Sequence, residues 1–285
     1  MTKILILGSA GMLGNALVKE FSNDYEVVGW DRAEIDITNE AEVQEKIHAL
    51  KPRLIINATG HNGVDLTETN GEVHELAKKI NGTAVGKLAH IAGNLSVPLV
   101  HYSTDYVFDG MSAAGYAEDA IPNPLSKYGH TKLLGEQLLQ KNTDQFYLIR
   151  LSRLFGRPGP SEASKKSFVD IILDLVTKQG KKEIPLVDEE FSCPTYSSDL
   201  ARFTKIVVDN KYPFGIYHGA NTGVCTWYEF GKKVFALKNL PVNVAAVTSA
   251  EHPRAASRPA RSELTNTKLP PQRPWEEALA EYLSP

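Results

Sequence analysis

The first fourteen residues constrain the fold more than any other part of the chain. An apolar run at residues 3–7 leads into Gly8-Ser-Ala-Gly11-Met-Leu-Gly14, and apolar residues then recur at helical spacing. In a strand–turn–helix unit of this kind, the first glycine allows a tight turn and the second lets the backbone approach a pyrophosphate. The third lets the helix pack on the strand. Glycines also suit a plain tight turn, but this position between a strand and a helix favours dinucleotide binding.

The helix that follows the glycines gives a second reason to expect a nucleotide. Its first residues, Met12 and Leu13, come directly after the turn. The N–H groups and the positive dipole end of a helix N-terminus bind phosphate. We therefore predict that Gly8, Gly11, Met12, Leu13 and Gly14 contact the dinucleotide.

A second apolar strand, residues 25–31, ends in the acid Asp31, about twenty residues beyond the central glycine. Such an acid binds ribose hydroxyls and favours NAD. Its neighbour Arg32 could instead pair with the extra phosphate of NADP, so NADH and NADPH both remain open. Asp36 and Ile37 follow in a short turn, where they either border the adenine or help to cap the next helix.

Strands and helices continue to alternate along the chain. A helix at 41–50 precedes a strand at 53–59, and a helix at 71–93 precedes a strand at 98–104. Near-continuous apolar runs suit parallel strands that are covered on both faces. The alternation predicts an α/β fold with a doubly wound, Rossmann-type parallel sheet.

Sheets of this type bind their ligands at the carboxyl ends of the strands. Ala58, Thr59 and Gly60 follow one predicted strand, and Ser103 and Thr104 end the next. We predict that the first three residues and Ser103 line the cofactor, and that Thr104 faces the reacting groups.

Tyr128 and Lys132 are the candidates for the chemistry. They lie four residues apart at the start of an apolar-periodic segment, so they share one face of a helix. A nearby ammonium favours the phenolate, so we expect Lys132 to lower the pKa of Tyr128 toward neutral pH. Thr104 could donate a hydrogen bond to the same oxygen. These groups are suited to moving a proton on and off a carbonyl oxygen while a hydride moves on the carbon.

The spacing alone is weak support, because Tyr228 and Lys232 repeat it. No Ser-Thr strand end precedes this second pair. Trp227, Phe230 and Val234 around it are typical of a packed helix. We therefore interpret Tyr228 and Lys232 as structural, with the lysine in water.

The pattern of the chain changes after residue 152, where a polar segment rich in glycine and proline begins. We predict a dinucleotide-binding domain at 1–152, to which the chain returns at about 195–220. Residues 153–194 and 221–285 would form a smaller α+β substrate-binding lobe, with the site in the cleft between the two parts.

Arginines on both sides of this boundary are candidates for ligand phosphates. Arg150 and Arg153 end a predicted strand, and Arg258 and Arg261 lie in a proline-rich tail. The alternatives are structural ion pairs for the first two and a solvated loop for the last two.

Composition argues against several classes of function. The net charge of −3 gives no reason to expect a nucleic acid or an anionic membrane as partner. Cys193 and Cys225 form no CxxC, so we expect neither a disulfide framework nor a zinc site, and a reducing cytoplasm fits. The histidines lack metal-binding spacing, no apolar run reaches the length of a membrane span, and the first residues do not resemble a signal peptide.

The most specific motif is Ser-Thr-Asp-Tyr-Val-Phe-Asp-Gly at 103–110. Further motifs are Pro124-xxx-Tyr-Gly-xx-Lys-xx-Gly-Glu136, Cys193-Pro-Thr195, Gly215-Ile-Tyr-His218, Trp227-Tyr-Glu-Phe230, Arg-Pro-Ala-Arg-Ser-Glu-Leu at 258–264 and Trp275-xx-Ala-Leu279. With the N-terminal glycines, they make the chain resemble the extended short-chain dehydrogenase/reductase family over nearly its whole length.

Within that family the chain looks most like the reductases of nucleotide-linked 6-deoxy-4-keto sugars, which reduce the C4 keto group in the last step to dTDP-L-rhamnose. The resemblance implies NADP(H) or NAD(H) as the cofactor. It implies Thr104, Tyr128 and Lys132 as the catalytic set, with Tyr128 and Lys132 also against the cofactor and Lys132 on the nicotinamide ribose.

The resemblance also indicates where the nucleotide sugar binds. The candidate substrate contacts are Thr104, Asp105, Tyr106, Arg153 and Arg258. Some relatives are magnesium-bridged dimers, so Mg²⁺ and a homodimer are expectations from the resemblance alone.

Two departures from the family pattern bear on the identity of the substrate. Arg153 stands where the family usually has Trp. The stretch Asn-Ala-Thr-Gly-His-Asn-Gly-Val-Asp at 57–65 stands where the family usually has Asn-Ala-Ala-Tyr-Thr-Ala-Val-Asp.

Two rival functions remain open. A sugar-nucleotide dehydratase or epimerase would share the fold, but dehydratases place a second carboxyl group after the acid, where this chain has Tyr106 after Asp105. A non-catalytic, NADP-binding regulatory subunit would be favoured by loss of the tyrosine or the lysine, and Tyr128 and Lys132 are both present.

Overall fold

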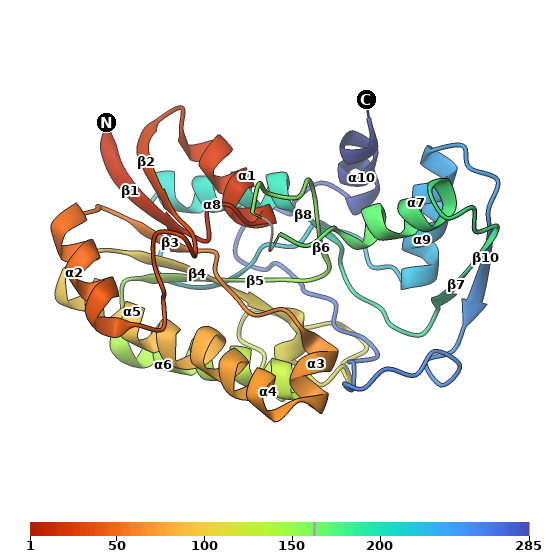
Figure 1. Ribbon diagram of the computed structural model, residues 1–285, viewed down its shortest axis with the longest axis horizontal. Coiled ribbons are helices and arrows are strands. Elements are labelled where there is room, and N and C mark those ends of the chain that lie inside the picture. Colours follow the sequence, from red (N-terminus) through yellow and green to blue (C-terminus); the bar gives the residue numbers. More distant parts are fainter. Residues whose placement is uncertain (162–163, 285) are drawn as a thin grey trace.

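A parallel sheet forms the centre of the protein, whose computed structural model describes residues 1–161 and 164–284. Within these residues the sheet has six strands in the order β2-β1-β3-β4-β5-β9 (Figure 1). The strands are β1 (Thr2–Leu7), β2 (Tyr25–Trp30), β3 (Ile55–Asn57), β4 (Leu99–Thr104), β5 (Phe146–Leu151) and β9 (Gly215–His218). The prediction of a doubly wound parallel α/β sheet is confirmed.

The direction of winding reverses at β1. Strand β2 pairs with one edge of β1, and β3 pairs with the other, both in parallel. Ligands of open α/β sheets bind outside the carboxyl ends of the strands at such a reversal. Gly8 follows β1 directly, so the glycine-rich turn lies where this rule expects a ligand.

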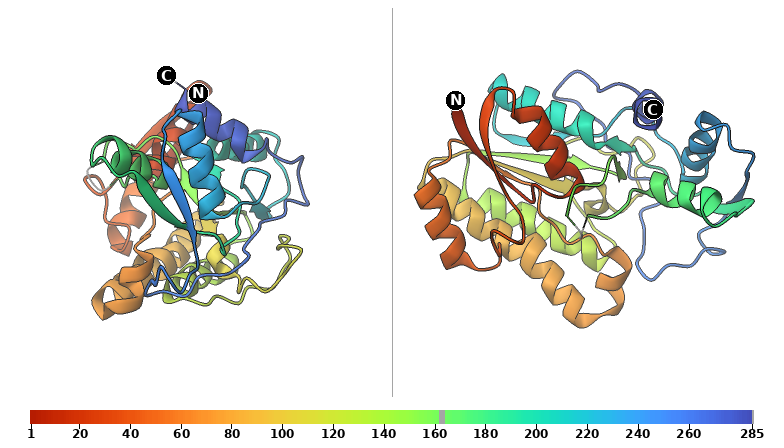
Figure 2. Two further views of the ribbon diagram at one scale, coloured as in Figure 1. Left: turned by 90° about the vertical axis from the view of Figure 1, so that its right-hand side faces the viewer. Right: turned by 45° about the horizontal axis from the view of Figure 1, so that its top comes forward.

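Helices cover both faces of the sheet (Figures 1 and 2). Alternate side chains of β1 point to opposite faces of the sheet. Ile4 and Ile6 pack in one apolar cluster, and Leu5 and Leu7 pack in the other. The first cluster includes side chains of α1 (Met12–Phe21) and α8 (Ser197–Asp209), and the second includes those of α2 (Glu40–Leu50), α5 (Ala84–Asn94) and α6 (Lys127–Asn142).

The helix predicted at 71–93 is interrupted by a wider turn. It consists of α4 (Gly71–Lys78), the π-helical turn η1 (Lys79–Thr83) and α5. Turns of this kind often occur at functional sites. Here the turn places Asn81 against the loop after β3, with consequences for the site. The short helix α3 (Val64–Thr69), which precedes α4, was not predicted.

A smaller lobe with its own apolar core lies beyond the carboxyl ends of β4 and β5 (Figure 1, right). Ile172, Phe230, Val234 and Leu279 are among the buried side chains of this core. The elements of the lobe are α7 (Phe168–Thr177), β7 (Glu183–Val187), α9 (Trp227–Leu237), β10 (Asn243–Val247) and α10 (Trp275–Leu283). Strands β7 and β10 pair in parallel, and β10 was not predicted.

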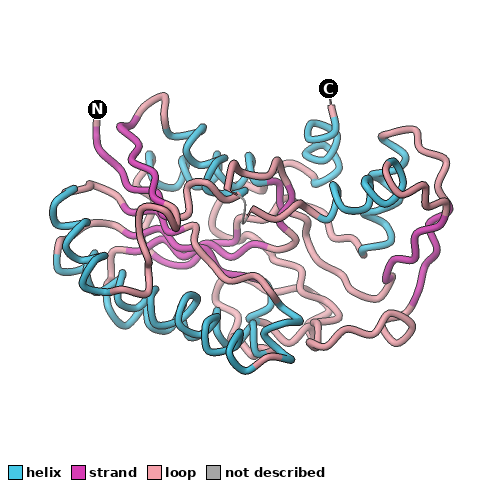
Figure 3. Tube along the Cα trace, in the orientation of Figure 1, coloured by secondary structure: helices cyan, strands magenta, loops and turns pink. Residues whose placement is uncertain are grey.

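Short elements and a long connection join the lobe to the sheet. Strand β6 (Leu154–Phe155) pairs with β8 (Thr195–Tyr196), and the 3₁₀ turn η2 (Asp105–Val107) follows β4. Between β10 and α10 the chain runs without a named helix or strand (Figure 3). This connection returns from the lobe to α3, where the Ala256 N–H donates to the Asp65 carboxylate at 3.1 Å.

Candidate functional site

The glycine-rich turn leaves no room for side chains. Gly8 has a φ of +75°, and a Cβ on it would lie 3.0 Å from the Ala58 carbonyl oxygen. A Cβ on Gly14 would lie 1.9 Å from the Gly8 carbonyl oxygen, so glycine is needed for α1 to approach β1 this closely. Gly11 is the N-cap of α1, and as a glycine it has no side chain to cap the helix. The turn and the uncapped helix start therefore fit a pyrophosphate, with Met12 and Leu13 in the first turn.

The connection from the sheet to the lobe packs on this turn. The Ser161 N–H donates to the Ala10 carbonyl oxygen at 3.1 Å. A Cβ on Gly159 would lie 2.1 Å from the same oxygen. The segment that leads to the lobe thus reaches the predicted phosphate site, a contact between two glycine-rich segments that was not predicted.

Asp31 and Arg32 follow β2, with Asp31 half-buried and Arg32 exposed. Arg32 acts electrostatically on His61, whose pKa is lowered mainly by burial and further by Lys165 and Arg32. Positive charges therefore gather near the loop after β3. The roles of Asp31 at the ribose hydroxyls and of Arg32 at a further phosphate remain predictions.

Asp36 and Ile37 lie just before α2. The Asp36 carboxylate accepts hydrogen bonds from the Thr38 N–H at 2.9 Å and the Thr38 hydroxyl at 2.8 Å. Asn39 is the N-cap of α2 and accepts from the Glu42 N–H at 3.4 Å. The turn thus leads into a side-chain cap, which was the alternative interpretation. A contact of Asp36 and Ile37 with adenine remains a prediction.

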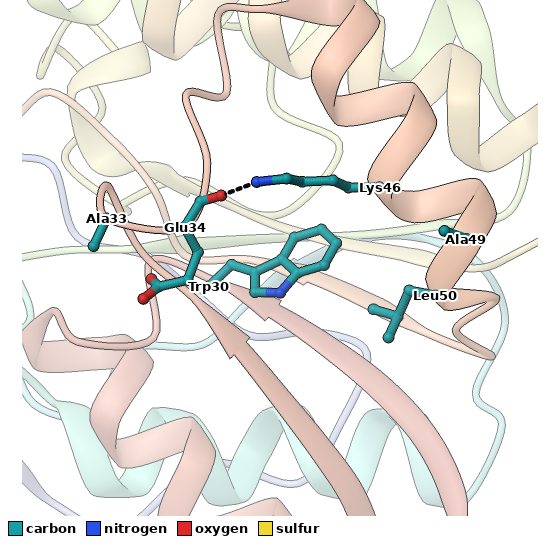
Figure 4. A pocket seen from close by; sticks show the side chains of 6 residues that line it. All are labelled: Trp30, Ala33, Glu34, Lys46, Ala49 and Leu50. Carbon is teal, nitrogen blue, oxygen red and sulfur yellow. Dashed lines mark hydrogen bonds between the residues drawn. The ribbon is translucent and has the colours of Figure 1, made fainter.

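An open hollow of about 560 Å³ lies beside this turn, on the α2 side of β2 (Figure 4). The Trp30 indole forms one wall, and Lys46 donates to the Glu34 carbonyl oxygen across it. The remaining lining residues are Ala33, Ala49 and Leu50. None of the predicted site residues lines this hollow, so it does not help to place the chemistry.

Two asparagines hold the loop after β3. Asn57 Oδ1 accepts from the Thr59 hydroxyl at 2.6 Å and from the Thr59 N–H at 3.2 Å. Asn81 accepts from the His61 N–H at 2.8 Å and donates to the His61 carbonyl oxygen at 3.0 Å and to the Thr131 hydroxyl at 3.1 Å. Asn81 therefore ties this loop to α6. Sequence reasoning missed it, because only the π-helical turn brings its side chain here.

The three candidate catalytic residues meet at the carboxyl edge of the sheet. Thr104 ends β4, and Tyr128 and Lys132 lie in the first two turns of α6, where Ser126 caps the helix by accepting from the Gly129 N–H at 3.1 Å. Thr104 and Tyr128 are each 8% exposed and Lys132 is 5% exposed. The Thr104 hydroxyl lies near the Tyr128 phenol and acts to lower its pKa.

The loop after β3 connects this set to the glycine-rich turn. Asn62 Oδ1 lies 3.5 Å from the Tyr128 phenol oxygen, at the limit of a hydrogen bond. Four residues earlier, the Ala58 carbonyl oxygen faces Gly8. The candidate proton donor and the predicted phosphate site therefore border the same short loop.

The expected effect of Lys132 on Tyr128 is wrong for this structure. Burial raises the pKa of Tyr128, and the nearby Asp105 and Tyr106 raise it further, while the contact with Thr104 opposes the rise. Lys132 donates instead to the Tyr102 carbonyl oxygen at 2.7 Å, and burial lowers the pKa of this lysine to about 8. Helical spacing puts both groups on one face of the helix, but burial is the largest influence on the pKa of each.

Asp105 and Tyr106 lie next to this set. The fully buried Asp105 carboxylate accepts from the hydroxyls of Thr104 at 3.0 Å, Ser152 at 2.9 Å and Ser262 at 2.6 Å. The Tyr106 ring meets the Tyr128 ring edge-on, with 5.9 Å between centroids. Ser103, in β4, is buried, and its hydroxyl has no hydrogen-bond partner in the described part of the chain.

Arg153 is held by the lobe. Its guanidinium lies over the Trp227 ring at 4.0 Å and donates to the carbonyl oxygens of Cys225 at 2.9 Å and Glu190 at 2.5 Å. Its φ of +41° is uncommon for a residue with a side chain. Trp227 thus places an aromatic ring against Arg153.

The other arginines have separate partners. Arg258 binds Asp65 through two hydrogen bonds of 3.0 Å and 2.7 Å, which join the connection to α3. Arg150 is fully buried and bound to Glu136 at 3.0 Å and 2.8 Å, so it is a structural ion pair rather than a phosphate ligand. Arg261 pairs with Glu263 at 2.9 Å, so the tail is neither fully solvated nor free of partners.

The second tyrosine–lysine pair supports the structural interpretation. Lys232 is exposed on α9 and its Nζ lies 3.3 Å from the Tyr228 phenol oxygen. This pair is in direct contact, whereas no such contact links Lys132 to Tyr128 in the part of the chain that is described. Burial at the sheet edge, rather than contact between the two side chains, distinguishes the candidate site.

The described residues contain neither a cluster that could hold a metal ion nor a helix that could span a membrane. Across residues 1–161 and 164–284, no three His, Cys, Asp or Glu side chains gather in a way that could hold a metal ion. The described helices include none that is long and apolar enough to cross a bilayer. Cys193 and Cys225 are buried free thiols.

Comparisons with known proteins agree with this arrangement. The family described as "RmlD substrate binding domain" matches residues 1–285. A dTDP-4-dehydrorhamnose reductase of Aggregatibacter actinomycetemcomitans is 36% identical, with 94% of this chain and 92% of the relative covered. The spore coat polysaccharide biosynthesis protein SpsK of Bacillus subtilis is 32% identical, over 99% of this chain and 97% of the relative.

A similar solved structure carries a cofactor. The crystal structure of a dTDP-4-dehydrorhamnose reductase from Bacillus anthracis in complex with NADP superposes with a TM-score of 0.92 at 31% identity. The match covers 99% of this chain and 99% of the other. The predicted resemblance to this family is therefore confirmed.

Proposed function

Because the chain belongs to the RmlD substrate-binding family, a branch of the extended short-chain dehydrogenases/reductases, we propose that it reduces the C4 keto group of a nucleotide-linked 6-deoxy-4-keto sugar. The proposed reaction converts dTDP-4-dehydrorhamnose to dTDP-L-rhamnose. The observation that carries the proposal is a buried phenol, Tyr128, beside Thr104 and Lys132 at the edge of the sheet that also holds the glycine-rich turn.

Each of these residues has a role in the proposed reaction. A bound NADPH or NADH supplies the hydride. Tyr128 gives its proton to the carbonyl oxygen as the alcohol forms, and a buried, protonated phenol suits this step. Lys132 holds the nicotinamide ribose with an ammonium that is fixed near the end of β4. Burial of the site strengthens these polar interactions, because little water screens them.

We propose NADP(H) or NAD(H) as the cofactor. The residues that would hold its phosphates and nicotinamide ring lie in the glycine-rich turn, in the loop after β3 and near the end of β4. They are Gly8, Gly11, Met12, Leu13, Gly14, Ala58, Thr59, Gly60 and Ser103. The Ser103 hydroxyl is a buried donor without a partner among the described residues, which supports a missing ligand at this edge. Asp31 and Arg32 would meet the adenosine ribose, and Asp36 and Ile37 the adenine.

The nucleotide sugar is proposed to bind on the lobe side of Tyr128. Asp105 and Tyr106 follow Thr104, and Arg153 and Arg258 come from the lobe and its connection. Asp105 is fully engaged with hydroxyls, so its contribution is to shape the site rather than to bind sugar directly. Arg153 offers a cation without a carboxylate in hydrogen-bond contact, which suits the diphosphate.

We also propose a division of the chain that matches these roles. The sheet and its covering helices lie within residues 1–152 and about 195–220, and the lobe elements lie within 153–194 and 221–285. Residues 162 and 163 are outside the described part of the chain. The homodimer and the Mg²⁺ dependence remain predictions, which light scattering with and without EDTA would check.

An activity screen tests the proposal. The purified chain is mixed with 4-keto-6-deoxy sugar nucleotides and either NADPH or NADH, and the absorbance of the reduced cofactor is followed. Net oxidation of the cofactor with formation of the 4-hydroxy sugar is expected. Turnover without net cofactor oxidation would instead indicate a dehydratase or epimerase. Tight cofactor binding with no turnover on any keto sugar would indicate a regulatory subunit.

A further inference from the structure

A carboxamide lies beside the phenol that is proposed to give the proton. The Tyr128 phenol donates to Asn62 Oδ1, with 3.5 Å between the two oxygens. This distance is the outer limit of a hydrogen bond, so Asn62 holds the phenol proton only weakly. Asn62 is exposed, whereas Tyr128 is 8% exposed. The carboxamide is therefore accessible to a ligand that approaches the phenol from solvent.

The backbone next to Asn62 is fixed relative to Tyr128. The His61 N–H donates to Asn81 Oδ1 at 2.8 Å, and the Asn81 amide donates to the His61 carbonyl oxygen at 3.0 Å. The same amide donates to the Thr131 hydroxyl at 3.1 Å, and this hydroxyl donates to the Tyr128 carbonyl oxygen at 2.8 Å. Asn62 and Tyr128 thus belong to one ring of hydrogen bonds that joins the loop after β3 to α6.

The Asn62 carboxamide also borders Gly60. A Cβ on this glycine would lie 3.5 Å from Asn62 Oδ1 and 3.6 Å from Asn81 Oδ1. The Asn62 amide nitrogen has no hydrogen-bond partner within residues 1–161 and 164–284. The carboxamide therefore keeps hydrogen-bonding capacity for a ligand, at a point between the phenol and a residue of the predicted cofactor site.

Reduction of a 4-keto sugar would change the partner of Asn62 Oδ1. The keto oxygen has to accept from the Tyr128 phenol, at a distance of about 2.7 Å, so the phenol has to turn away from Asn62. In a 6-deoxy-4-keto hexose the carbon on one side of the keto group, C3, carries a hydroxyl. The carbon on the other side, C5, carries the methyl group C6. Only the C3 side therefore offers a donor that could replace the phenol at Oδ1.

We propose that Asn62 is a substrate-binding residue that recognises the C3 hydroxyl of the sugar. This hydroxyl donates to Asn62 Oδ1 when the Tyr128 phenol turns to the keto oxygen. Oδ1 loses one donor and gains another, so the exchange leaves no acceptor without a partner. The inference rests on the proposed function, because it concerns the sugar that the same site would reduce.

A pair of substrates tests this role. The ratio kcat/KM is measured for a 4-keto-6-deoxy sugar nucleotide and for its 3-deoxy analogue, in the parent chain and in Asn62→Ala. The parent should prefer the sugar that carries the hydroxyl. Asn62→Ala should lose about 3–10-fold on that sugar alone, as expected for one neutral hydrogen bond. Asn94→Ala, at the exposed end of α5, is the matched control and should keep both values.

The comparison separates a contact with the hydroxyl from an effect that acts through Tyr128. A displaced phenol or an altered cofactor site would lower kcat/KM by the same factor for both sugars. Equal losses in Asn62→Ala would therefore overturn the inference. A parent chain that does not distinguish the two sugars would overturn it too, as would a preference for the hydroxyl that survives in Asn62→Ala.

Binding measurements separate this inference from the proposed function. The dissociation constants of both sugar nucleotides are measured by calorimetry in the presence of NADP⁺ or NAD⁺, so that no turnover is needed. A preference for the hydroxylated sugar that is lost in Asn62→Ala would support the role of Asn62 even if no sugar is reduced. If the chain reduces keto sugars and this preference is unchanged in Asn62→Ala, the function stands and the role of Asn62 falls. Failure of both nucleotides to bind would overturn both.

Discussion

Lys132 carries an ionisable amine and is almost fully buried. Burial lowers its pKa from the ordinary value of 10.5 to about 8. Between these two values the unfolded chain binds more protons than the folded chain, so the contribution of this group to the free energy of unfolding rises with pH. Below pH 8 the amine is charged in both states, and the cost of burying that charge is present in full.

Lys132→Met should therefore stabilise the fold while it abolishes turnover. At pH 7 the free energy of unfolding should rise by about 1–3 kcal/mol, and this gain should shrink as the pH increases from 8 to 10.5. Urea unfolding at several pH values measures it. Lys232→Met, at the exposed second pair, is the control for loss of a lysine that is not buried. A Lys132→Met protein that is less stable than the parent at every pH would contradict the account.

The site residues illustrate what a sequence can and cannot predict at this scale. Thr104, Tyr128 and Lys132 could be found because spacing and a strand end are local properties. The pKa of Tyr128 could not be predicted, because it depends on the burial of the phenol and on the nearby Asp105, and both follow from the tertiary fold. Asn81 was missed for the same reason, because its bond to Thr131 joins residues 50 positions apart.

At the scale of elements, α6 and η2 approach closely because Gly129 has no side chain. A Cβ at this position would lie 2.4 Å from the Tyr106 carbonyl oxygen, and backbone at that distance has to move. Tyr128 is the preceding residue of α6, so any shift of the helix would also displace the phenol from Thr104. Gly129 thus helps to position the Tyr128 phenol, because it allows α6 to pack closely on η2.

Gly129→Ala should cost stability and activity together. The overlap should lower the free energy of unfolding by about 1–3 kcal/mol, and turnover should fall because the phenol moves. Gly71→Ala is the matched control, since a Cβ at the start of α4 meets no atom within 4 Å. Thermal unfolding and steady-state kinetics of both variants check this. Native stability and activity in Gly129→Ala would show that α6 does not need this close approach.

Helices and strands with a clear hydrophobic period or a capping motif can be predicted from the sequence. Elements that depend on pairing with a distant segment cannot. Helix α7 has strong local signals, because an apolar periodic segment follows Ser167, which forms a capping box with Asp170. Strand β10 exists through its pairing with β7, and its sequence alone does not distinguish it from a loop. The π-helical turn within the predicted 71–93 helix has no local signature that we could read.

At the scale of the whole molecule, contacts of Ser262 and Arg258 are among those that fasten the lobe side to the sheet. Ser262 donates to Asp105 at the end of β4, and Arg258 pairs with Asp65 on α3. Both come from the connection between β10 and α10, so this one segment contacts the site from two directions. The carboxylate of Asp65 is partly exposed, so its ion pair with Arg258 should add on the order of 1 kcal/mol or less to the free energy of unfolding.

Asp65→Asn should loosen this connection without unfolding the sheet. Backbone amides near Ala256 should exchange hydrogen faster, because Asp65 accepts from the Ala256 N–H as well as from Arg258. Amides of β1 and β4 should keep their protection. Hydrogen exchange read by mass spectrometry distinguishes these regions. Equal acceleration in the sheet would mean that the pair stabilises the whole fold rather than the position of the connection.

The central claim is that Tyr128 delivers the proton, and a comparison of Tyr128→Phe with Tyr228→Phe tests it most directly. Turnover of a 4-keto-6-deoxy sugar nucleotide is measured with the reduced cofactor, alongside the dissociation constant of the cofactor. Tyr128→Phe should lose about 10²–10⁴-fold in kcat while the cofactor still binds, and Tyr228→Phe should behave like the parent. Near-normal turnover in Tyr128→Phe would contradict the account.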